Sequence, residues 1–179
     1  IVLSRRRAAY RAKGYVKYTW EVPADRFYKE DTNSVCPQIE NHALMPYIQE
    51  NRVSSPEQKF TTFLEENTEY IDWWYKNGDS GKQHYAISYT NVNGDKALFY
   101  VDFVIRMKNG QVFLFDTKSE DSDKNAPCKH NALIDYIHSE ENADKHLKGG
   151  VIIQSGENWK YCPLKIENTT DISGWDCFY

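Results

Sequence analysis

The sequence predicts an α/β domain in which helices flank a central β-sheet. Two almost wholly apolar runs, 98–107 and 111–118, are joined by a tight turn, Lys108-Asn109-Gly110, and predict a hairpin of buried strands. A Ser-Ser-Pro-Glu-Gln sequence before an apolar run predicts a helix start near residue 56. A helical stripe of apolar residues at 133–137 predicts a second helix after the hairpin. The length of 179 residues fits one domain, with room for an extension.

The elements are expected in the following order. A leading segment at 1–52, with a short helix near 5–12, precedes a core at 53–165 and a tail at 166–179. The first core helix, 56–66, has Ser55 as its expected N-cap, Pro56 at its first position and Gln58 closing a capping box. Strands are predicted at about 69–75, 84–90, 97–107, 111–118, 150–154 and 159–164, and 84–118 supplies the central sheet. The polar loop 119–124 leads to a helix at 125–141, Gly149-Gly150 marks a turn, and 165–179 is expected to be irregular.

The register of the hairpin decides what its polar residues can do. A three-residue loop ending at Gly110, in the left-handed conformation that glycine tolerates, places Asp102 directly opposite Asp116. Tyr100 and Lys118 would then lie next along the same face. A two-residue turn would instead put the two aspartates on opposite faces. We expect the register that brings both carboxylates together.

Two neighbouring carboxylates in apolar strands need a shared proton or a cation. Oxygen ligands suit a hard ion such as magnesium, and Lys118 could stabilise the charge that develops during phosphodiester hydrolysis. The backbone carbonyl of Thr117 and the side chain of Glu57, on the core-facing side of its helix, complete the candidate set around Asp102 and Asp116. The alternatives are a buried Asp116–Lys118 ion pair with Asp102 capping a loop, and a Glu57 that only favours its helix start.

These residues also carry a resemblance. Glu57, Asp102 and Asp116-Thr117-Lys118 resemble the active-site signature of the PD-(D/E)xK nuclease superfamily. The flanking sequence is similar to the C-terminal part of type III restriction enzyme helicase subunits and their relatives. The similar segments cover roughly residues 35–140 and are HALMPY, SPEQKF, WWYKNG, FYVDF and FDTK.

The resemblance implies a restriction-endonuclease-like fold, with helices on a mixed sheet, and magnesium-dependent cleavage of DNA, in which manganese can substitute. It implies metal ligands at Glu57, Asp102 and Asp116, and catalytic roles for these three acids and Lys118. It also implies an upstream helicase motor and a separate methyltransferase or specificity subunit as partners. One departure is Val101, which stands where the family has proline. Because valine keeps its N–H and does not bend the chain, we expect a straighter strand there.

Two further regions are candidates for contact with DNA. Lys129, His130 and Asn131 lie in the early turns of the second helix and are expected to touch the backbone of DNA. The alternative is an amphipathic cover helix with Lys129 exposed. Residues 1–20 carry six basic side chains and no acid, so this segment either contacts phosphates or is a solvated linker from a missing motor.

Composition narrows the remaining classes. The net charge of −4 argues against a general nucleic-acid binder. The chain has no signal peptide or apolar run of membrane-spanning length, and its four cysteines form no C-x-x-C pair, which is typical of a cytoplasmic protein with reduced thiols. The 77–83 segment lacks the spacing of a phosphate loop, so ATP is not expected to bind. Besides the nuclease, we keep two hypotheses: a catalytically silent nuclease-fold module for DNA binding or assembly, and an unrelated structural α/β domain.

Overall fold

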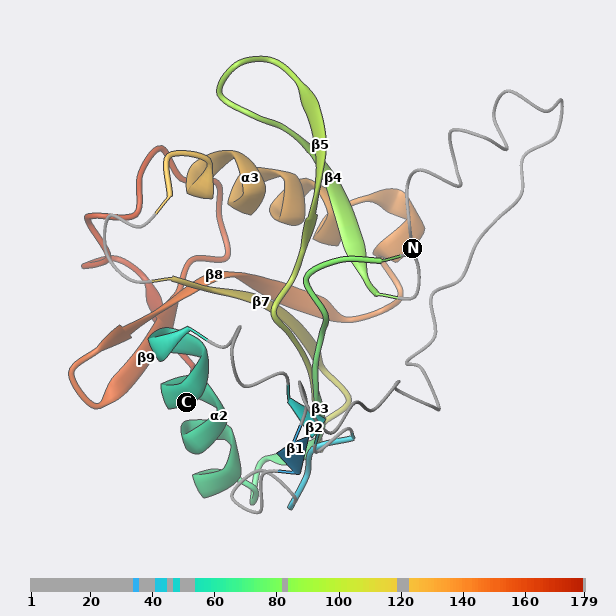
Figure 1. Ribbon diagram of the computed structural model, residues 1–179, viewed down its shortest axis with the longest axis vertical. Helices are drawn as coiled ribbons and strands as arrows, with labels where there is room; N and C mark the ends of the chain where they lie inside the picture. The colour runs from blue at the N-terminus through green and yellow to red at the C-terminus, as the bar shows by residue number, and fades with distance from the viewer. Residues whose placement is uncertain are drawn as a thin grey trace, which may run out of the picture.

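The structure of the chain is a computed structural model (Figure 1). It describes residues 34–35, 41–44, 47–48, 54–81, 84–118 and 123–178. The expected helix at 5–12, the basic segment at 1–20 and most of the loop at 119–124 lie outside these residues. In the part that is described, no helix combines the length and the apolar character that crossing a bilayer requires.

A six-stranded mixed sheet forms the centre of the fold, in the order β10-β9-β8-β7-β6-β3. Strands β7 and β8 run parallel and the other neighbours are antiparallel, so the expected α/β architecture with a mixed sheet is confirmed. The strands are β3 (Ile71–Lys76), β6 (Phe103–Met107), β7 (Val112–Lys118), β8 (Leu147–Ser155), β9 (Asn158–Tyr161) and β10 (Asp176–Cys177). Two short strands, β1 (Ser34–Val35) and β2 (Tyr47–Ile48), pair separately.

Helix α2 (Ser55–Glu66) covers one face of the sheet and helix α3 (Ala126–Ile137) the other, as Figure 1 shows. A short 3₁₀ helix at Glu140–Asn142 follows α3. The start of α2 differs in detail from the prediction, because Ser54 is the N-cap and Glu57 closes the capping box. Ser55 and Gln58 were expected in these roles. Glutamate at the third helical position reaches back to the N-cap more readily than the glutamine that follows it.

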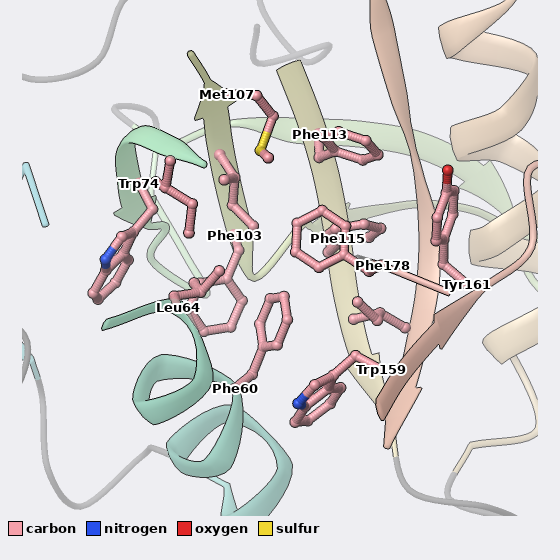
Figure 2. Packing of buried hydrophobic residues seen from close by; sticks show 13 residues of the cluster. Phe60, Leu64, Trp74, Phe103, Met107, Phe113, Phe115, Trp159, Tyr161 and Phe178 are labelled. Atoms are coloured by element: carbon pink, nitrogen blue, oxygen red, sulfur yellow. The ribbon is translucent and has the colours of Figure 1, made fainter. Parts of the chain in front are cut away.

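Aromatic side chains fill the space between α2 and the sheet (Figure 2). Phe60 of α2 lies at the centre of this core, with ring centroids 4.7 Å from Trp159 and 5.0 Å from Phe103. Glu65 ties the same helix to β3, because its carboxylate accepts a hydrogen bond of 2.6 Å from the indole N–H of Trp74. This packing fixes α2, and with it Glu57, against the end of the sheet.

A second core lies between α3 and the opposite face of the sheet. Successive side chains of a strand alternate between faces, so Leu114 and Val104 meet Leu133 and Ile137 of α3 while their neighbours face α2. The hairpin of β4 (Ala86–Thr90) and β5 (Lys96–Tyr100) also packs on this side and extends beyond α3 in Figure 1.

The expected strand at 97–107 is interrupted. Residues Lys96–Tyr100 pair with β4 in a separate two-stranded sheet, and the chain bends at Val101 and Asp102 before β6 begins. Three expectations were therefore wrong: β4 is not in the central sheet, the strand is not straight at Val101, and Tyr100 pairs with Ala86 and not beside Lys118. Hydrogen bonds from Asn77 to the carbonyls of Val101 and Asp102 hold this bend.

The register predicted for the hairpin is confirmed. Phe103 pairs with Phe115 and Arg106 with Val112, which is the predicted register and puts Asp102 and Asp116 next to the paired residues Phe103 and Phe115. The backbone N–H of Gly110 donates to the carbonyl of Met107 at 2.9 Å, and Gly110 has a φ of +87°. Glycine adopts this left-handed conformation without steric cost, as the three-residue loop requires.

The C-terminal third differs from the prediction in two places. Gly149 and Gly150 lie inside β8 and not in a turn, with φ values of +141° and +142°. A Cβ atom on Gly149 would stand 1.9 Å from the carbonyl oxygen of Leu114, so glycine permits the close approach of β8 to β7. The tail at 165–179 is not wholly irregular, because it supplies β10 and the buried side chain of Phe178.

Candidate functional site

The candidate residues gather where β3, β6 and β7 meet the start of α2. Lys76 ends β3 and pairs with Phe103, which in turn pairs with Phe115. The end of β3, the start of β6 and the end of β7 therefore lie at the same end of the sheet. Asp102 stands at the bend before β6, and residues 116–118 close β7. The register alone therefore brings Asp102 and Asp116-Thr117-Lys118 together, and α2 adds Glu57.

Asp102 is oriented by bonds to both neighbouring strands. Its N–H donates to the carbonyl of Phe115 at 2.9 Å, and its carbonyl accepts from the N–H of Asn77 at 2.8 Å. Its Oδ2 accepts two hydrogen bonds from Thr117, 2.8 Å from the backbone N–H and 2.7 Å from the hydroxyl group. The carboxylate is thus held toward Thr117 and leaves its other oxygen, Oδ1, for other partners.

Asn77 holds the bend at which Asp102 stands. Its buried side-chain amide donates to the carbonyls of Tyr85 and Val101, both at 2.8 Å, and its Oδ1 accepts from the N–H of Tyr85 at 3.1 Å. These are backbone groups that a continuous sheet would otherwise satisfy. The Asn77 side chain therefore bonds to the backbone at both ends of the β4–β5 hairpin, at Tyr85 before β4 and at Val101 after β5.

Glu57 takes part in two structural interactions. Its Oε1 accepts from the N–H and the hydroxyl group of Ser54, at 3.3 and 2.7 Å, and its Oε2 lies 2.9 Å from the ammonium group of Lys76. The same ammonium group lies 3.6 Å from Oδ1 of Asp102. Lys76 is therefore a buried cation between two carboxylates. Sequence reasoning assigned it no role, although it closes an apolar strand in the same way as Lys118.

Asp116 and Lys118 form a second, deeper ion pair. Lys118 Nζ lies 2.9 Å from Oδ1 of Asp116, and the Asp116 side chain is 6% exposed. Burial raises the pKa of Asp116 to about 6; Lys118 opposes the rise and Asp102 adds to it. An ion pair alone would lower the pKa of the acid, so the cost of desolvation outweighs the pair here. Burial lowers the pKa of Lys118, but Asp116 and Asp102 raise it by more, so this group is a cation at neutral pH.

One oxygen of Asp116 remains open. Its Oδ2 is buried and has no hydrogen-bond partner among the described residues; we call this atom the open oxygen of Asp116. A buried carboxylate oxygen without a partner is costly, and such an atom in a native structure calls for a proton, a water molecule or an ion. The open oxygen is therefore the one feature of the site that points to a ligand.

The three residues expected to contact DNA have other partners. His130 is 1% exposed, accepts from the N–H of Val151 at Nδ1 and lies 2.7 Å from the carbonyl of Leu164 at Nε2. A side chain buried and bonded in this way cannot reach a phosphate, so the expectation for His130 was wrong. The amide of Asn131 bonds to the backbone of Ile166.

The third of these residues, Lys129, pairs with Asp123 and is only partly exposed. Burial raises the pKa of Asp123, but its hydrogen bonds with Lys129 and Asn125 lower it by more. The charge of Asp123 also raises the pKa of Lys118, so the site has a fourth acidic neighbour that sequence reasoning missed. DNA contact by Lys129 and Asn131 stays a prediction.

The donors fit a hard divalent ion at one point. Asp102 and Asp116 adjoin the paired residues Phe103 and Phe115, and Asp102 raises the pKa of Asp116. Lys118 pairs with Oδ1 of Asp116, while the open oxygen of Asp116 is left for an ion. Within the described ranges, no three His, Cys, Asp or Glu side chains gather closely enough to form a ready metal centre. The fit therefore rests on two carboxylates, with the carbonyl of Thr117 nearby, and not on a preformed cage.

Comparison with known proteins adds no assignment, since no family model, curated protein or solved structure matches this chain.

Proposed function

We propose that this chain is a magnesium-dependent nuclease domain that hydrolyses phosphodiester bonds in DNA, on a restriction-endonuclease-like fold. The observation that carries the proposal is the open oxygen of Asp116, buried beside Lys118 and cross-strand from Asp102. The ion pair with Lys118 uses only the other oxygen of Asp116, and a divalent ion would give the open oxygen a partner. The DNA substrate and the place of the domain in a type III restriction-like helicase rest on the resemblance of the sequence.

In the proposed site, Asp102, Asp116 and the carbonyl of Thr117 would hold Mg²⁺ or Mn²⁺. When bound, the ion would polarise a phosphoryl oxygen and make a water molecule more acidic. Thr117 keeps the Asp102 carboxylate in one orientation through its two hydrogen bonds, which reduces the reorganisation needed on binding.

Lys118 would supply a fixed positive charge beside the phosphate. Its pKa is raised, so it stays protonated at neutral pH and acts as a hydrogen-bond donor and not as a general base. With its side chain only 16% exposed, the ammonium group acts in a medium of low polarity, where charge stabilisation is stronger than in water.

The test is nicking of supercoiled plasmid with and without Mg²⁺. Asp116→Asn and Lys118→Met should each lower the metal-dependent rate by at least about 100-fold, the scale on which removal of one electrostatic stabiliser acts. Asp135→Asn and Lys165→Met are matched controls, because these residues form an exposed ion pair on the surface. Equal rates in all five proteins would overturn the proposal.

One observation favours a second candidate, a nuclease-fold module that binds DNA without cutting it. Lys76 already pairs with both Glu57 and Asp102, as it would in a site that no longer needs a metal. For this candidate, gel-shift titration would show DNA binding that is independent of Mg²⁺, and the plasmid would stay supercoiled. Cleavage that depends on Asp116 would exclude it.

A further inference from the structure

Lys76 is held in place on all sides that the structure describes. Its ammonium group lies 2.9 Å from Oε2 of Glu57, 3.6 Å from Oδ1 of Asp102 and 3.5 Å from the carbonyl of Asn77. The same group stands 5.1 Å from the ring centroid of Phe103. Such a contact between a cation and an aromatic face is favourable, most of all where water is excluded.

The stem of Lys76 leaves it little freedom to move away. The residue belongs to β3 and pairs with Phe103 in the sheet, and its side chain is 10% exposed. A surface lysine exchanges partners freely, but a lysine whose chain is packed in a core keeps one geometry. The positive charge between Glu57 and Asp102 is thus a permanent part of the fold.

The Glu57 carboxylate beside Lys76 has little capacity left for a metal ion. Glu57 Oε1 already accepts two hydrogen bonds from Ser54, and Oε2 faces the ammonium group. A divalent ion at Oε2 would stand directly against the charge of Lys76, which disfavours it strongly. On the other side of Asp102, Lys118 pairs with Oδ1 of Asp116, and the open oxygen of Asp116 has no hydrogen-bond partner in the described structure.

From this asymmetry we infer that the site takes a single divalent ion, on the Asp116 side of Asp102. Lys76 is a fixed cation between Glu57 and Asp102, where a second ion would otherwise bind. The inference rests on the proposed function and names the number and place of its ions. Glu57 is then a positioning residue, which holds Lys76 and the start of α2, and not a metal ligand. The distinction matters chemically, because a fixed ammonium group can stabilise charge but cannot activate a water molecule as a metal ion does.

The experiment counts Mn²⁺ ions on the full chain by calorimetry and by electron paramagnetic resonance. We expect one ion in the wild type and in Glu57→Gln, with the hyperfine spectrum of an isolated Mn²⁺. Lys76→Met keeps the length of the side chain and removes its charge, so it should admit a second ion and give the spectrum of a coupled pair. Lys108→Met is the matched control, because the ammonium group of this exposed lysine donates to the backbone carbonyls of Thr68 and Glu69 and not to a carboxylate of the site; this variant should bind one ion.

Several results would overturn the inference: two ions or none in the wild type, no ion in Glu57→Gln, or one ion in a folded Lys76→Met. If Lys76→Met does not fold, as circular dichroism would show, the wild type and Glu57→Gln still decide. The outcome is separate from that of the proposed function. A protein that binds one Mn²⁺ and leaves the plasmid intact supports the inference and contradicts the proposed nuclease function. A protein that cuts DNA with two bound ions supports the nuclease function and contradicts the inference.

Discussion

Replacing Asp116 by asparagine should change how the stability of the fold depends on pH. Burial raises the pKa of Asp116 from 3.8 to about 6 in the folded protein. The folded state therefore keeps its proton to a higher pH than the unfolded state, so the free energy of unfolding falls as the pH rises through this interval. At about 1.4 kcal/mol per pKa unit, the difference corresponds to about 3 kcal/mol in all. Asparagine has no proton to lose, so Asp116→Asn should not show this fall.

The measurement is urea unfolding of both proteins without divalent ions between pH 4.5 and 7.5. The stability of the wild type relative to Asp116→Asn should fall by about 2 kcal/mol over this range, most of it below pH 6. Asp135→Asn serves as the control for replacing an exposed aspartate. A difference that stays constant with pH would refute the reasoning, because it would mean that Asp116 is hydrated and that its open oxygen needs no ion.

Two further predictions concern the scaffold of the site. Phe60→Ala should lower the free energy of unfolding by about 3–5 kcal/mol in urea titrations, because Phe60 is fully buried among the aromatic residues under α2. A loss below about 1 kcal/mol would show that this core is loosely packed. Asn77→Ala should cost on the order of 3 kcal/mol, since it removes three buried hydrogen bonds to backbone groups of Tyr85 and Val101, whereas Asn93→Ala in the exposed β4–β5 turn should cost little. Equal stability of the two asparagine variants would contradict the role given to Asn77.

The parts of the structure that local rules determine were predictable. The loop ending at Gly110 fixes its own register, and alternation along β6 and β7 then places Asp102 opposite Asp116 over fewer than twenty residues of chain. Helix α2 begins within one residue of its prediction, because its N-cap, its proline and its acidic first turn act locally. The residues of the candidate site that belong to this hairpin, Asp102 and 116–118, could therefore be predicted from the sequence.

Features that depend on distant partners were not predictable. The positive φ values of Gly149 and Gly150 serve contacts with β7 and with His130, which the sequence around them does not reveal. His130 reads as a polar surface residue, yet its ring nitrogens bond to backbone groups more than twenty residues away. Lys76 gives the same local signal as Lys118, but only the packing of α2 shows which carboxylates it contacts.

The chain bends at Asp102 although it lacks the proline that would bend it locally. Proline before the aspartate would bend the strand and remove a donor, and Val101 does neither, so a straight strand was expected. The bend forms nevertheless, because the amide of Asn77 takes the carbonyl of Val101 and the N–H of Asn77 binds the carbonyl of Asp102. Hydrogen bonds from Asn77, which follows β3, thus bend the chain as a proline ring would. It follows that Val101→Pro should keep the stability of the wild type in urea unfolding only if the proline leaves both hydrogen bonds to Asn77 intact.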